Sequence, residues 1–157
     1  MRNNIWLEKI LAEVWHDHFA DVSKENQVYI VFGRKARRRL ASIRQFSRHD
    51  KNSNTKILVT GHFQDERVPE EIVKVTIAHE LCHYAHGFAS PLPKFFRFPH
   101  RGDVVDAELR KRGLGDILKF QEQWLKDVWS SIVGESARPK NRTRARRKFR
   151  FKLRFFS

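Results

Sequence analysis

The chain has 157 residues, of which 40% are apolar and 13 are phenylalanine, so it can form one domain with a hydrophobic core and still carry a tail. Its single cysteine, Cys82, excludes an internal disulfide and fits a small buried residue in a reducing compartment. No apolar run reaches the roughly 18 residues that span a bilayer, and the first residues lack the apolar stretch of a signal peptide. We therefore expect a cytoplasmic protein with no membrane partner.

The formal net charge of +14 is concentrated at one end of the chain. Residues 138–157 contain ten Lys or Arg and no acid, and subtracting these ten charges leaves only +4 for residues 1–137. We therefore divide the chain into a domain, residues 1–137, and a basic, aromatic-rich C-terminal tail, residues 138–157.

Apolar residues recur at helical spacing from about residue 3 to residue 20, which predicts an amphipathic first helix. His16 and His18 fall near its end, and we interpret them as surface or interface groups rather than metal ligands.

Three short runs with strand character follow, at residues 28–32, 40–46 and 56–60. The polar stretch between the second and third runs is typical of a hairpin loop. Consecutive strands with short links predict a small antiparallel meander packed on one side by helices, an α+β fold. Basic residues at positions 34–39 crowd the first predicted hairpin, as a solvated turn or as part of a nucleic-acid surface.

A helix is predicted from about Pro69 to His86, and it carries the motif H-E-x-x-H at His79, Glu80 and His83. Residues four apart lie on one face of a helix, so the two imidazoles can share one zinc ion and leave a position open for water. Glu80 would reach that water rather than the metal and act as the catalytic base. The helix is otherwise largely apolar, and burying these three polar groups in it is costly unless a metal partners them.

Zinc with two helical histidines needs a third protein ligand. His100 is the favoured ligand, because a loop of about a dozen residues can bring the start of the next helix beside the motif. His86, one turn beyond His83, and Glu108 or Asp103 on the next helix are the alternatives.

The segment after the motif helix, residues 88–99, contains three prolines and four phenylalanines. It cannot be a regular helix throughout, and we expect it to fold over the core or line the cleft. A further helix is predicted from about residue 100 to 112, and a final amphipathic helix from 115 to 133.

Two segments resemble the SprT-like family of zinc metalloproteases, which includes the Spartan type of DNA–protein crosslink protease. They are ILVTGHFQDERVPEEIVKVTIAHELCHYAHG at residues 57–87 and PHRGDVVDAELRKRGL at residues 99–114. The resemblance implies a zincin-like domain of the small gluzincin type. It also implies that His79, His83 and His100 bind zinc and that Glu80 is the catalytic base.

For substrate binding we expect an extended peptide to pair with an exposed strand edge at residues 57–60, which would place its carbonyl near the zinc. Tyr84 and His86 are candidates for stabilising the oxyanion, although neither is identified by a motif.

The tail alternates phenylalanines with cations in its second half, after a run of charges. We expect it to bind the phosphate backbone of nucleic acid, mainly through Arg144, Arg146, Arg147, Lys148 and Arg150, with Phe side chains stacking on unpaired bases. Docking of the tail as an edge strand, a solvated tail and contact with an anionic membrane are the alternatives.

The predicted function is therefore a zinc metalloendopeptidase that acts on proteins associated with nucleic acid. The alternative is a non-catalytic nucleic-acid-binding protein with a structural zinc site. In a third possibility, the tail of the peptidase binds a protein partner instead.

Overall fold

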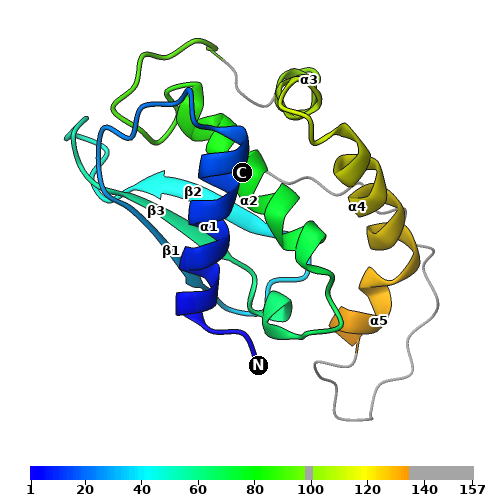
Figure 1. The fold of residues 1–157 in the computed structure, drawn as a ribbon. Coiled ribbons are helices and arrows are strands. Elements are labelled where there is room, and N and C mark those ends of the chain that lie inside the picture. Colours follow the sequence, from blue (N-terminus) through cyan, green and yellow to red (C-terminus); the bar gives the residue numbers. More distant parts are fainter. Residues whose placement is uncertain (98–100, 135–157) are drawn as a thin grey trace.

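A computed structural model of the chain describes residues 1–97 and 101–134 (Figure 1). Its elements, in chain order, are α1 (Asn4–His18), β1 (Val28–Phe32), β2 (Ala41–Gln45), β3 (Thr55–Val59), the 3-10 turn η1 (Gly61–Gln64), α2 (Glu70–Ala85), α3 (Val104–Lys111), α4 (Gly115–Asp127) and α5 (Trp129–Gly134). No helix in these described ranges is long and apolar enough to cross a membrane.

The three strands form a mixed sheet in the order β1-β3-β2. β3 pairs in parallel with β1 and antiparallel with β2, so that Ile57 lies opposite both Ile30 and Ile43. The predicted α+β class is confirmed, but the predicted antiparallel meander is wrong. Only the polar loop between β2 and β3 joins neighbouring strands as an antiparallel hairpin.

The link between β1 and β2 explains this strand order. It crosses the end of β3, where the Gly33 amide donates to the Val59 carbonyl and the Thr60 amide donates to the Leu40 carbonyl. The Thr60 hydroxyl also donates to the Ala36 carbonyl at 2.9 Å. Because these bonds hold the link over β3, β1 and β2 end on opposite sides of it and no first hairpin forms.

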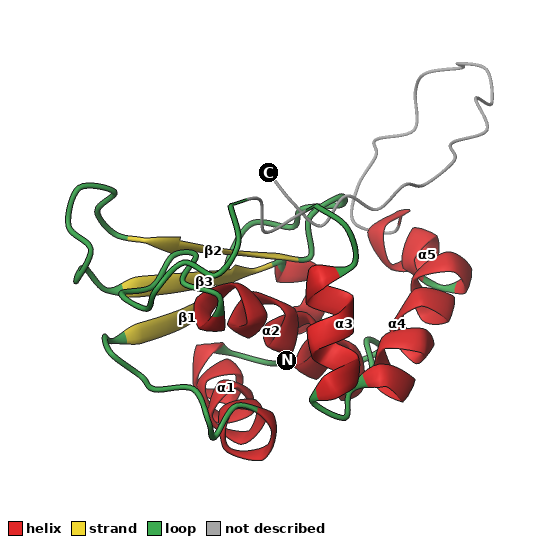
Figure 2. Ribbon diagram, turned by 90° about the horizontal axis from the view of Figure 1, so that it is seen from above, coloured by secondary structure: helices red, strands yellow, loops and turns green. Residues whose placement is uncertain are grey.

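Helices α1 and α2 cover one face of the sheet (Figure 2). That face carries the buried residues Ile30, Ile43 and Ile57, which alternate with more exposed neighbours as expected for strands with one solvated face. On the opposite face, Tyr29 and Phe46 are exposed and pack edge to face with ring centroids 5.8 Å apart.

The motif helix α2 lies in the centre of the molecule, between the sheet and α1 on one side and α3 and α4 on the other (Figures 1 and 2). Most of its side chains are therefore buried all round. The buried side-chain amide of Gln121 on α4 is hydrogen-bonded to α2, because its Nε2 donates to Thr76 Oγ1 at 2.8 Å. This position explains why most residues of the helix are apolar.

The predicted helices are confirmed with shifted boundaries. The first helix is amphipathic, as predicted, with Asn3 capping it by accepting a hydrogen bond from the Trp6 amide. The last predicted helix is two helices, α4 and α5, which are divided by a turn at Val128.

Candidate active site

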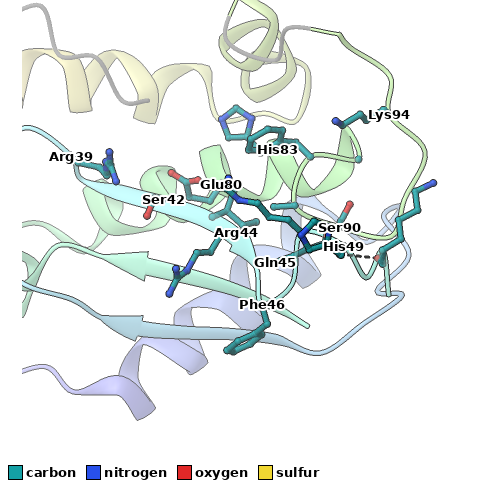
Figure 3. A pocket seen from close by; sticks show the side chains of 16 residues that line it. Arg39, Ser42, Arg44, Gln45, Phe46, His49, Glu80, His83, Ser90 and Lys94 are labelled. Carbon is teal, nitrogen blue, oxygen red and sulfur yellow. Dashed lines mark hydrogen bonds between the residues drawn. The ribbon is translucent and has the colours of Figure 1, made fainter. Parts of the chain in front are cut away.

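A cleft with a volume of about 1000 Å³ lies beside the C-terminal half of α2 (Figure 3). One wall is the outer edge of β2 with the loop that follows it, and the other is the segment after α2, residues 87–94. Glu80 and His83 from α2 both line this cleft. The structure therefore brings two of the predicted site residues to one accessible cavity.

The two motif histidines lie side by side, one turn apart on α2. Their ring centroids are 5.0 Å apart with the planes at 72°. His83 is buried and packs against Phe88, with ring centroids 5.7 Å apart, whereas His79 is partly exposed. Two imidazoles so close together on one helix are the donor type and spacing that a zinc site needs, so these residues fit two of its ligands.

Within residues 1–97 and 101–134, no three His, Cys, Asp or Glu side chains are grouped so that they could hold one ion. His86, Glu108 and Asp103 therefore do not complete a site with His79 and His83. His86 instead faces Glu108, with Nε2 3.9 Å from Oε2, and Glu108 also accepts a hydrogen bond from Arg112 Nε at 2.8 Å. The favoured third ligand, His100, lies outside the described residues.

Glu80 is almost fully buried and has an altered acidity. Burial raises its pKa to about 8, and the charge of Arg39 opposes this shift. A buried carboxyl with this pKa can both take up and release a proton near neutral pH. A divalent cation beside it would favour the ionised form, as any nearby positive charge does.

Neither Cys82 nor Tyr84 lines the cleft. Cys82 is buried and burial raises the pKa of its thiol, as expected for the predicted structural residue. The Tyr84 hydroxyl donates to Asn26 Oδ1 at 2.8 Å and accepts from the Glu25 amide at 3.1 Å, and its ring packs against Trp15 of α1. The structure therefore does not bring Tyr84 to the cleft as an oxyanion donor.

The predicted substrate edge is wrong. Residues 57–60 were expected to form an exposed edge, but β3 is the central strand and has a partner on each side. The edge that lines the cleft is that of β2, through Ser42, Ile43, Arg44 and Gln45. Sequence reasoning missed these residues because strand order depends on long-range pairing.

The wall of the cleft that residues 87–94 form is held in place by a sharp turn at the end of α2. Gly87 has φ +75°, and the Phe88 amide donates back to the His83 carbonyl at 2.9 Å. The Ser90 hydroxyl donates to the Tyr84 carbonyl at 2.7 Å, and the Thr55 hydroxyl of β3 donates to the Ala89 carbonyl at 2.7 Å. These bonds hold the segment after α2 against both the helix and the sheet.

No protein-family model, no curated protein and no solved structure matches this chain. The five tail residues predicted to contact nucleic acid, like the rest of residues 135–157, lie outside the described residues.

Proposed function

We propose that the chain is a zinc-dependent metalloendopeptidase of the SprT-like type, acting on proteins held near nucleic acid by the basic tail. One observation carries this proposal: Glu80 and His83 line the same cleft, next to His79 and along the outer edge of a strand. A peptidase needs these three features together, namely a metal-binding pair, a proton acceptor and a surface that holds an extended peptide.

The zinc would be held by His79 and His83, with His100 as the third ligand. A bound zinc supplies a Lewis acid and a water whose pKa falls from about 15.7 to near 7. Glu80 would accept a proton from the attacking water and would later donate one to the leaving amine nitrogen, so protons balance over the cycle.

The edge of β2 would hold the substrate in this scheme. An extended peptide can add to a strand edge through its main chain, which positions it without regard to most of its side chains. Because β2 borders the cleft that contains Glu80, a peptide paired there lies close to the base. The low exposure of Glu80 also limits the access of bulk water to the reacting group.

The test compares zinc content and peptide cleavage in the full chain and in Glu80→Gln. We expect the variant to keep its zinc and to lose at least about 100-fold in kcat/KM, because it lacks only the proton acceptor. Glu71→Gln, on an exposed position of the same helix, is the matched control and should cleave normally. Equal cleavage by Glu80→Gln would remove the proposed base, and a zinc-loaded wild-type chain without peptidase activity would support the non-catalytic alternative.

A further inference from the structure

The cleft that contains Glu80 is strongly basic. Among the described residues that line it, Glu80 is the only carboxylate, whereas five are Lys or Arg: Arg39, Arg44, Arg48, Lys51 and Lys94. All five are exposed, and they come from both walls of the cleft. Figure 3 shows Arg39 and Arg44 beside β2 and Lys94 on the segment after α2. Positive charge therefore lies on both walls of the cleft and is not confined to one loop.

Four of these cations form no ion pair with another described residue. The fifth cation, Arg39, is close enough to Glu80 that its positive charge opposes the rise in the pKa of this carboxyl. The ion pairs found within residues 1–97 and 101–134 use other cations, such as Lys74 and Arg112, and none includes Arg44, Arg48, Lys51 or Lys94. A ligand with negative charges would relieve the mutual repulsion of these side chains.

The wall formed by β2 indicates the kind of ligand. Hydrogen bonds from the Thr60 amide to the Leu40 carbonyl and from the Phe46 amide to the Asn54 carbonyl show that the even-numbered residues of this strand turn their backbone groups toward β3. In an antiparallel pair these groups alternate, so Ala41, Ile43 and Gln45 direct their N–H and C=O groups to the outer edge. No backbone bond to that edge is found among the described residues.

This combination favours a polypeptide over nucleic acid. A strand edge offers alternating donors and acceptors, which an extended peptide can match and a sugar-phosphate chain cannot. The tail of this chain is a poor occupant, because its ten Lys or Arg would be repelled by the same cations.

We propose that the cleft selects acidic polypeptide segments: β2 pairs with the main chain of the substrate, while Arg44, Arg48, Lys51 and Lys94 contact Asp or Glu side chains near the scissile bond. This substrate class rests on the metallopeptidase function proposed above. It implies that the enzyme cleaves acidic, extended regions of proteins in preference to neutral or basic ones.

The test measures kcat/KM of the full chain on three quenched-fluorescence peptides that differ only in having Glu, Gln or Lys around one cleavable bond. We expect about tenfold faster cleavage of the Glu peptide than of the Gln peptide at low salt, with the ratio falling as salt screens the exposed charges. The double variant Arg44→Glu/Arg48→Glu should lose or reverse the preference. Lys119→Glu/Lys126→Glu, on exposed positions of α4, makes the same change in net charge and should retain it.

Equal cleavage of the three peptides would overturn the acidic specificity and leave the peptidase function standing. A preference that survives Arg44→Glu/Arg48→Glu undiminished would also overturn it, because two of the four cations assigned to the substrate would then contribute nothing to selectivity.

Absence of cleavage with every peptide would contradict the proposed function, and binding then tests the cleft separately. Fluorescence anisotropy with the Glu80→Gln chain should show tighter binding of the Glu peptide than of the Gln peptide, and Arg44→Glu/Arg48→Glu should remove the difference. A single-stranded oligonucleotide whose affinity falls more than that of the Glu peptide in this double variant would assign the cleft to nucleic acid and overturn the proposal.

Discussion

Gln121 is a buried polar side chain whose two hydrogen-bond partners both belong to the motif helix α2. Its amide donates to Thr76 Oγ1 at 2.8 Å and lies 3.4 Å from the Ile72 carbonyl. It ties α4 to α2 on the side opposite the sheet, so it supports the helix that carries the site.

We expect Gln121→Leu to lower the free energy of unfolding by about 1 kcal/mol, since it removes a buried hydrogen bond while keeping most of the volume. Urea denaturation measures this. Gln123→Leu, at an exposed position of the same helix, should change stability by less than about 0.5 kcal/mol. Equal effects of the two substitutions would show that the contact with α2 contributes nothing.

Arg112 joins α3 to the end of α1. It donates to Asp21 Oδ1 at 2.6 Å and to the His18 carbonyl at 2.7 Å, and its guanidinium lies 4.3 Å from the Phe19 ring centroid. The hydrogen bond from Arg112 lowers the pKa of Asp21 below its usual value. A carboxyl with a lowered folded pKa stabilises the fold above its ordinary pKa, near 3.9, and loses that contribution as pH falls through the folded value.

The variant Asp21→Asn should therefore be less stable than the wild type near neutral pH, by no more than about 1 kcal/mol because Asp21 is well exposed. The two proteins should converge in stability as the pH falls through the lowered pKa of Asp21 in the folded protein. Thermal unfolding across this pH range tests the expectation, and a difference that stays constant with pH would contradict it.

At the scale of single residues, the motif could be predicted from sequence because its spacing is local. The acidity of Glu80 could not, since it depends on burial by other elements and on Arg39, 41 positions earlier in the chain. The sequence also suggests Tyr84 as an oxyanion donor. In the structure its hydroxyl is instead hydrogen-bonded to Glu25 and Asn26, on the other side of the helix.

Among the elements, the end of α2 shapes the cleft most directly. A Cβ on Gly87 would lie 2.1 Å from the Pro93 carbonyl oxygen, and the residue has φ +75°. Gly102 has nearly the same φ, +76°, but none of the residues that the structure describes lies within 4 Å of the corresponding position. Replacing Gly87 by Ala therefore introduces both backbone strain and a steric clash, whereas replacing Gly102 by Ala introduces backbone strain alone.

We expect Gly87→Ala to destabilise the domain by about 2 kcal/mol or more and to reduce cleavage, because the segment after α2 must move away. Gly102→Ala should cost only about 1 kcal/mol, from strain alone. Chemical denaturation measures the free energy of unfolding of both variants. Equal losses would show that the segment around Pro93 moves aside at no cost in free energy.

The helices could be predicted from their apolar periodicity, whereas the sheet could be predicted only in part. Each strand was located by its residues, but the strand order depends on the link over β3 and on hydrogen bonds that join residues about 20 or more positions apart. The wrong choice of β3 as the substrate edge follows directly from the missed strand order.

At the scale of the whole molecule, α2 is buried between two layers and its C-terminal half opens on one basic cleft. The walls of this cleft come from segments separated by about 40 residues, so the sequence alone located the motif but not the surface around it. The tail adds a second basic region to the chain.

We expect the tail to bind single-stranded nucleic acid in a strongly salt-dependent way. Replacing Arg144, Arg146, Arg147, Lys148 and Arg150 by Ala should weaken binding and reduce the slope of log K against log salt by about 3.5, if each of the five cations neutralises one phosphate of a single strand. Fluorescence anisotropy over a salt series measures the slope. An unchanged slope would place the nucleic-acid contacts elsewhere.

The most direct test of the central claim is the number of zinc ions bound per chain, measured by elemental analysis of the purified full-length protein. We expect about one zinc in the wild type and in His16→Ala, an exposed residue of α1, and none in His79→Ala/His83→Ala, because in the proposed site this pair supplies two of the three ligands. A wild-type chain that binds no zinc, or a double variant that keeps it, would contradict the account.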